Sequence, residues 1–226
     1  MWLVIRPRFD EATEYSFEWA QEIVDFLEEN LIPHIDLAEE KAIKENVEGV
    51  LTNDPDLAVI HYDHGSEDAI YGNDGNPVIN LANNKLLKNR ECFNMNCLSA
   101  KVLGVDSYWR YNTVYWGSWE VIAFITTPNA LLLFKEALNF PIKRMLGGEE
   151  DWNKIMDETK ENDDRIIDKM ISIGETFAAA VHLSNRGSRR VWTEKTPPDD
   201  QESDCIFRRL ALKLLGQKAW RIQRPF

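Results

Sequence analysis

The chain has 226 residues, 44% of them hydrophobic and 11% aromatic, a composition typical of a globular protein with a sizeable buried core. Its net charge of −12 would repel phosphate backbones, so nucleic acid is not an expected partner. No apolar stretch is long enough for a membrane span, and the N-terminus lacks the apolar core of a signal peptide. We therefore expect no membrane partner.

In the first two-thirds of the chain, short apolar runs alternate with amphipathic stretches, a pattern that is typical of βαβ units around a parallel sheet. The apolar runs predict strands at Trp2–Arg6 and at residues 32–37, 57–62, 92–97 and 112–116. Apolar residues at helical spacing predict helices over residues 14–31 and 38–51. Two short apolar runs flank Asp74-Gly75, and this turn signal predicts a small β-hairpin standing off the main sheet.

The pattern becomes helical after Thr126, with helices predicted over residues 128–146 and 151–183. A Pro- and acid-rich loop over residues 194–204 and a short helix over 205–215 follow. We therefore predict an α/β core over residues 1–126 and a helical region over 127–226 that packs on the core or extends it. We interpret a group of basic residues as a positive C-terminal tail that balances the acidic body: Arg186, Arg189, Arg190, Arg208, Arg209, Arg221 and Arg224.

The three cysteines of the chain indicate in which cellular compartment the protein is found. Cys92, Cys97 and Cys205 cannot all pair with one another, and no disulfide framework is visible. Thiols that stay reduced are typical of intracellular proteins, so we expect a cytoplasmic location. Cys92 and Cys205 are interpreted as packing residues because unpaired cysteines are usually small buried hydrophobes.

Reactive side chains follow two of the predicted strands. In an open α/β sheet, ligands bind beyond the carboxyl ends of the strands. The strand over 57–62 leads into Asp63-His64-Gly65, and the strand over 92–97 ends on Cys97. A thiol needs a nearby base to act as a nucleophile at neutral pH, and histidine is suited to that task. The sequence therefore predicts a cysteine–histidine pair, with the backbone N–H groups of Gly65 and Cys97 as oxyanion donors.

Three segments carry a family resemblance: LAVIHYDHGSEDAIYG with the hairpin after it, CFNMNCLSAKVLG, and NTVYWGSW. They resemble the caspase-like superfamily of cysteine peptidases, which includes caspases, metacaspases, legumain, clostripain and gingipains. The resemblance covers roughly residues 2–126. It implies a three-layer α-β-α sandwich with a mostly parallel sheet. It also implies hydrolysis of a peptide or protein substrate, with Cys97 as the nucleophile and His64 as the acid and base.

In such relatives the position two residues before the nucleophile and the end of the first strand help select the substrate. Here these positions carry Met95 and the group Arg6, Arg8 and Asp10. An arginine would select acidic side chains and an aspartate basic ones, so the preference stays open. The alternative is that these charges are merely solvated at the strand end.

Several alternatives concern the neighbours of His64. His61 lies within the apolar run and is interpreted as a core histidine, and Asp63 either orients a histidine or caps the strand end. A metal site made from His61, Asp63, His64 and Cys97 is disfavoured because adjacent residues of a strand point to opposite faces. No Gly-rich phosphate loop follows the first strand, so no cofactor is expected. A non-catalytic interaction module and an acyl transferase or other thiol enzyme stay open as alternative functions.

Overall fold

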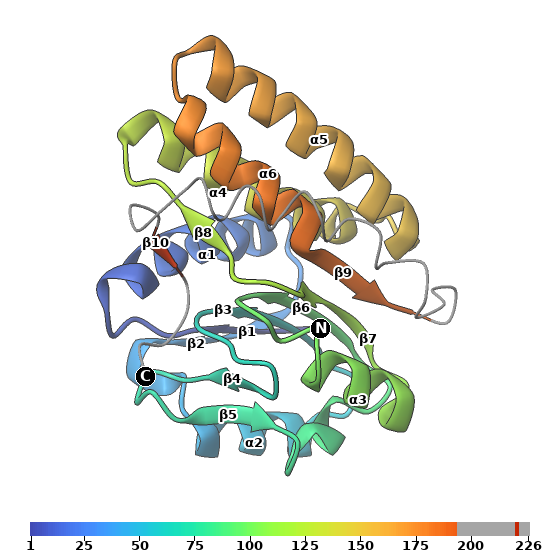
Figure 1. Ribbon diagram of the computed structural model, residues 1–226. Helices are drawn as coiled ribbons and strands as arrows, with labels where there is room; N and C mark the ends of the chain where they lie inside the picture. Colours follow the sequence, from blue (N-terminus) through green and yellow to red (C-terminus); the bar gives the residue numbers. More distant parts are fainter. Residues whose placement is uncertain (194–219, 222–226) are drawn as a thin grey trace.

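A six-stranded sheet forms the middle layer of the protein, in the order β2-β1-β3-β6-β7-β9 (Figure 1). The computed structural model describes residues 1–193 and the backbone of residues 220 and 221. Neighbouring strands are parallel from β2 to β7, and only β9 at the edge runs antiparallel within this sheet. The strands are β1 (Trp2–Arg6), β2 (His34–Ala38), β3 (Ala58–Tyr62), β6 (Glu91–Met95), β7 (Val114–Ser118) and β9 (Arg189–Trp192).

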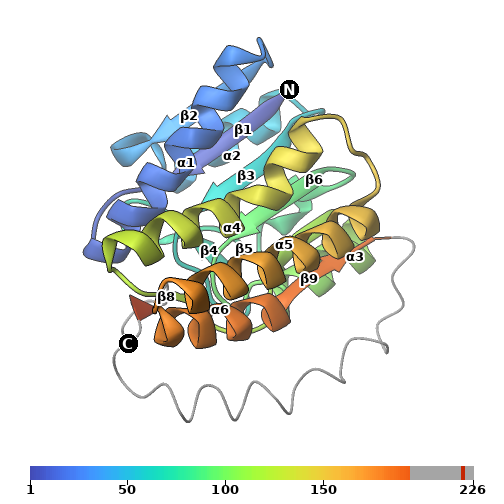
Figure 2. The same ribbon diagram turned by 90° about the horizontal axis from the view of Figure 1, so that it is seen from above.

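Helices cover both faces of the sheet, so the expected α/β sandwich with a mostly parallel sheet is confirmed (Figures 1 and 2). One face is covered by α1 (Glu11–Glu29), α4 (Pro128–Leu146), α5 (Trp152–Ser172) and α6 (Thr176–Ser188). The other is covered by α2 (Lys44–Asn53), α3 (Leu103–Tyr111), the 3-10 turns η1 (Glu39–Lys41) and η2 (Asn84–Leu87), and the hairpin β4 (Ala69–Tyr71) and β5 (Pro77–Asn80). This hairpin is a separate two-stranded sheet, as expected.

Two apolar clusters fill the spaces between these layers. Ile60 and Tyr62 of β3 belong to the cluster on the α1 face, whereas Val59 belongs to the cluster on the opposite face. All five residues of β3 are buried, because both faces of this central strand are covered. Helices α4, α5 and α6 share the α1-face cluster with the sheet.

Helix boundaries differ from the predicted ones where capping and glycine chemistry act. Helix α1 begins at Glu11 rather than residue 14, because Asp10 and Thr13 form a capping box. The helix predicted over residues 151–183 is two helices, and Gly174 lies between them at φ +84°, which favours glycine. The helix predicted over 38–51 is likewise divided into η1 and α2.

The interpretation of Arg189 and Arg190 as part of a basic tail is wrong. Both lie in β9 at the edge of the sheet, and both are buried. The side chain of Arg189 donates from Nε to Oδ2 of Asp163 at 2.9 Å. The loop expected over 194–204 and the helix expected over 205–215 lie outside the described residues, as do Cys205, Arg208, Arg209, Arg224 and the side chain of Arg221.

Helix α4 matches its predicted range, although it carries Pro141 in its interior. Among the described helices, none has both the length and the apolar character needed to cross a membrane.

Candidate active site at the carboxyl ends of β3 and β6

The ends of β3 and β6 bring His64 and Cys97 to the same edge of the sheet. Tyr62 pairs with Met95, and His64 and Cys97 each follow two residues later along their parallel strands. A Cβ atom on Gly65 would lie 2.5 Å from the carbonyl oxygen of Cys97. The two segments are therefore in direct contact, and only a glycine fits between them.

Both side chains lie on the face of the sheet that α1 covers. Cys97 belongs to the apolar cluster that also contains Tyr62 and Trp19 of α1. His64 contacts the segment just before α1, where the ring centroid of Phe9 lies 5.6 Å from that of His64. A cysteine–histidine pair requires this arrangement on one face.

Asp10 holds the imidazole of His64. The Nε2–H group of His64 donates to Oδ2 of Asp10 at 2.7 Å. Because an ionised carboxylate only accepts hydrogen bonds, this contact fixes the proton of the neutral ring on Nε2. Nδ1, which is buried and has no hydrogen-bond partner among the described residues, then keeps its lone pair. His64 is therefore held in the tautomer in which Nδ1 can accept a proton.

Asp10 has a second role as the N-cap of α1. Its Oδ1 accepts a hydrogen bond from the backbone N–H of Thr13 at 2.8 Å. Burial alone would raise the pKa of Asp10, but the hydrogen bonds from His64 and Thr13 outweigh it and lower the pKa to about 2. Sequence reasoning placed Asp10 in a substrate pocket and missed this contact. The Asp10-x-x-Thr13 spacing was the available signal, because a capping box fixes where the carboxylate lies.

Cys97 is fully buried and contacts Ile122, which follows β7. The backbone N–H of Ile122 donates to Sγ of Cys97 at 3.3 Å, and Sγ lies 3.7 Å from the carbonyl oxygen of Ile122. The next residue, Leu98, adopts φ +63°, a left-handed conformation that costs energy for a branched side chain. The chain thus turns sharply just after the thiol, and a thiolate at Cys97 would already face one N–H donor.

Asn96 and His61 support the turn from the other face of the sheet. Nδ2 of Asn96 donates to Nδ1 of His61 at 3.0 Å, and Nε2 of His61 donates to the carbonyl oxygen of Tyr71 at 2.9 Å. Burial lowers the pKa of His61 to about 4, so the ring is neutral at physiological pH. His61 is thus a core histidine, as expected, and it links β3 to the hairpin and to the residue before Cys97.

Asp63 does not orient a histidine. It is fully buried, and neither carboxylate oxygen has a hydrogen-bond partner among the described residues. Burial raises the pKa of this carboxyl group well above its usual value, which favours the neutral acid. The role that the sequence left open for Asp63 belongs to Asp10.

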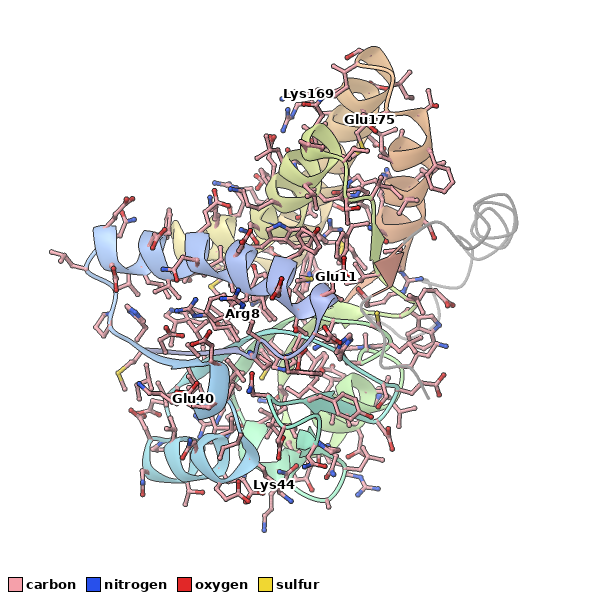
Figure 3. All side chains as sticks on the ribbon, turned by 90° about the vertical axis from the view of Figure 1, so that its left-hand side faces the viewer. Arg8, Glu11, Glu40, Lys44, Lys169 and Glu175 are labelled. Atoms are coloured by element: carbon pink, nitrogen blue, oxygen red, sulfur yellow. The ribbon has the colours of Figure 1, made fainter. Side chains whose placement is uncertain are left out.

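The predicted substrate-selecting residues separate into two groups. Arg8 and Asp10 line a pocket of about 390 Å³ together with Phe9, Glu11, Glu14 and Glu39. Figure 3 labels two of these lining residues, Arg8 and Glu11. Arg6 does not line it: its guanidinium pairs with Asp36 at 2.6 Å and lies 4.4 Å from the ring centroid of Phe17. Met95 is also absent from the lining, because its side chain is buried in the apolar core.

Replacing Gly65 by alanine tests the contact between the two strand ends. The added Cβ would overlap the backbone of Cys97, so we expect G65A to lower the free energy of unfolding by about 1–3 kcal/mol, the usual cost of overpacking. Urea unfolding measures this change. The matched control is G49A on the exposed side of α2, where a Cβ meets nothing within 4 Å. We expect G49A to be neutral or to stabilise by roughly 0.5–1 kcal/mol. Equal effects of the two substitutions would contradict the close approach.

The described residues contain no group of three or more His, Cys, Asp or Glu side chains that could hold a metal ion. Comparison of the chain with protein-family models, with curated proteins and with solved structures gives no match. The interpretation of the site therefore depends on its own geometry.

Proposed function

We propose that this protein is a cysteine peptidase of the caspase-like type, with Cys97 as the nucleophile and His64 as the general acid and base. The observation that supports the proposal is the contact of Gly65 with the backbone of Cys97, because His64 and Cys97 flank this contact and both lie on the α1 face of the sheet. The hydrogen bond from His64 to Asp10 adds the group that orients the base.

The proposed reaction has two steps. Nδ1 of His64 takes the thiol proton while Sγ of Cys97 attacks the peptide carbonyl carbon, and the backbone N–H groups of Gly65 and Cys97 stabilise the oxyanion. The tetrahedral intermediate collapses, the C–N bond breaks, and His64 passes its proton to the leaving amine. A water molecule, deprotonated by His64, then hydrolyses the thioester and regenerates the thiol.

Selective alkylation tests the nucleophile. We expect iodoacetamide at pH 7 to label Cys97 and to spare Cys92, because burial raises the pKa of Cys92 far above its usual value and keeps it a thiol. Peptide-level mass spectrometry distinguishes the two sites. His64→Ala should slow the labelling of Cys97, whereas replacing His34 should not. Equal inertness of Cys97 and Cys92, both in the wild type and in the Trp220→Pro variant described below, would argue against a thiol enzyme.

A non-catalytic interaction module is the second candidate. Its supporting observation is burial: His64 is 1% and Cys97 0% exposed, so a substrate would reach the thiol only after a covering segment moves. The same alkylation experiment separates the two candidates. A cytoplasmic location is proposed with either, because Cys92 and Cys97 are both thiols.

A further inference from the structure

A short strand beside Cys97 is paired with the C-terminal part of the chain. Strand β8 (Ala123–Phe124) lies outside the central sheet and forms a two-stranded antiparallel sheet with β10 (Trp220–Arg221) (Figures 1 and 2). Phe124 pairs with Trp220, and Ala123 pairs with Arg221. β8 follows Ile122 directly, and Ile122 is the residue whose backbone contacts the thiol of Cys97.

Hydrogen bonds on the opposite side of β8 show which way its backbone groups point. The N–H of Ala123 donates to Oδ1 of Asn185 at 3.0 Å, and Nδ2 of Asn185 donates to the carbonyl oxygen of Ala123 at 2.6 Å. Along an extended chain, backbone N–H and C=O groups alternate between the two sides. The groups of Ile122 and Phe124 therefore point away from Asn185. Cys97 and β10 are their respective partners on that side.

The direction of β10 leads toward the thiol. Because the pairing is antiparallel, the step from Trp220 to Arg221 runs along β8 from Phe124 to Ala123. One more residue in this register would stand opposite Ile122, where Sγ of Cys97 lies 3.3 Å from the backbone nitrogen. A peptide docked on β8 in this direction therefore approaches the proposed nucleophile.

Charge favours the C-terminal segment as the occupant. Residues 207–226 contain six basic residues and no acidic one, although the chain as a whole has a net charge of −12. The ring of Phe124 packs against Tyr15 and Trp19 of α1, at centroid distances of 5.5 and 4.9 Å. Helix α1 starts at the pocket that Asp10, Glu11, Glu14 and Glu39 make predominantly acidic, with Arg8 as its one basic lining residue. The basic composition of this segment therefore complements the acidic surface at the start of α1.

We propose that β8 is a docking strand for an extended basic peptide, and that the chain's own segment around Trp220 occupies it and shields Cys97. Addition of a strand to an exposed edge is a general mode of peptide recognition, in which main-chain hydrogen bonds supply the affinity. The role of β8 as a substrate-binding strand rests on the proposed peptidase function. The docking itself does not need the thiol to react.

Proline substitutions in the full-length chain test the pairing. Trp220 faces Phe124, so Trp220→Pro removes an N–H that points toward β8. Arg221 stands opposite Ala123, whose backbone N–H and C=O groups bond to Asn185 on the other side of β8. The backbone N–H of Arg221 therefore points away from β8. Arg221→Pro is the matched control because it removes an N–H that makes no bond to β8. We expect hydrogen exchange of the Phe124 amide to be at least about ten-fold faster in W220P, the equivalent of one lost hydrogen bond, and little changed in R221P.

Two further measurements use the same variants. The alkylation rate of Cys97 by iodoacetamide should rise in W220P and not in R221P. A fluorescein-labelled peptide with the sequence of residues 215–226 should bind W220P more tightly than the wild type, because the docking strand is then vacant. Glu11→Gln with Glu14→Gln should weaken this binding and reduce its dependence on salt.

The outcomes separate the two proposals. Equal exchange of the Phe124 amide in the wild type and W220P, together with no binding of the labelled peptide, would overturn the docking proposal. Slow exchange of that amide in the wild type and peptide binding by W220P, with no hydrolysis of any peptide by W220P, would uphold docking and argue against the peptidase. Unchanged circular dichroism of W220P excludes unfolding as the cause of any effect.

Discussion

Asp10→Asn is expected to lower the rate of peptide hydrolysis by about 10²–10⁴-fold, with the upper limit set by loss of the orienting carboxylate in serine-protease triads. The physical reason is the tautomer of His64. The carboxylate of Asp10 can only accept from Nε2–H, at 2.7 Å, whereas an asparagine can donate its NH₂ group to Nε2 and move the ring proton to Nδ1. His64 would then lose the lone pair that takes the thiol proton. Steady-state kinetics on a peptide substrate measures the loss in kcat.

Asparagine is chosen because it is as good an N-cap as aspartate, so α1 should keep its start. Glu18→Gln is the matched control, since Glu18 is an exposed carboxylate of α1 that does not line the pocket beside Asp10. We expect its kcat to stay within about two-fold of the wild type, as for a surface charge. A D10N enzyme with wild-type kcat would show that Asp10 is only a cap.

The effect of D10N on the free energy of unfolding should also depend on pH in the acid range. The pKa of Asp10 is lowered from 3.8 to about 2, so its carboxylate stabilises the folded state fully above pH 4. That contribution is lost as the pH falls from 4 toward 2 and the carboxylate is protonated. The stability difference between wild type and D10N should therefore shrink as the pH falls from 4 toward 2.

Asp163→Asn is expected to lower the free energy of unfolding by about 3–5 kcal/mol, the usual cost of breaking a buried ion pair. Asp163 on α5 is fully buried and accepts hydrogen bonds from Nε and Nη2 of Arg189 in β9 and from Nε2 of His182 in α6. Nη2 of Arg189 also donates to the carbonyl oxygen of Ala137 in α4. The carboxylate therefore links α5 and α6 to the edge strand, and its partner Arg189 adds the contact with α4. Removing its charge leaves a buried guanidinium without a counter-ion.

The adjacent residue supplies the control. Asp164 pairs with Arg186 at 2.7 Å, but its side chain is 56% exposed, so Asp164→Asn should cost no more than about 1 kcal/mol. Urea unfolding of both variants measures the difference. The double variant Asp163→Leu with Arg189→Met should recover part of the loss, because it removes both charges. Similar stabilities of D163N and D164N would contradict the role of the buried pair.

Burial also determines how Asp163 responds to acid. Desolvation raises its pKa, but the charges of Arg189 and His182 outweigh this and hold the pKa below its usual value. The stabilising contribution of Asp163 is therefore present above its unfolded-state pKa and lost as the pH falls below it.

The strands of the parallel sheet could be predicted because continuous apolar runs are what a strand covered on both faces requires. β1 and α4 have their predicted ranges, and β3 differs by one residue. The edge strand β9 was not predicted because Arg189 and Arg190 resemble a solvated basic cluster when only the sequence is considered. The burial of Arg189 depends on Asp163, a partner 26 residues earlier in the chain, which no local pattern reveals.

At the candidate site, the sequence by itself determined that a histidine-glycine pair and a cysteine follow two neighbouring buried strands. The tertiary structure decided the roles of the charged residues around them. It placed Asp10 on the imidazole of His64, buried Arg6 against Asp36, and left Asp63 without a partner among the described residues. The physical reason is that strand order and apolar burial are encoded in local patterns. Which carboxylate contacts His64 depends on how the capped start of α1 packs over the ends of β3 and β6, and that packing joins residues 54 positions apart.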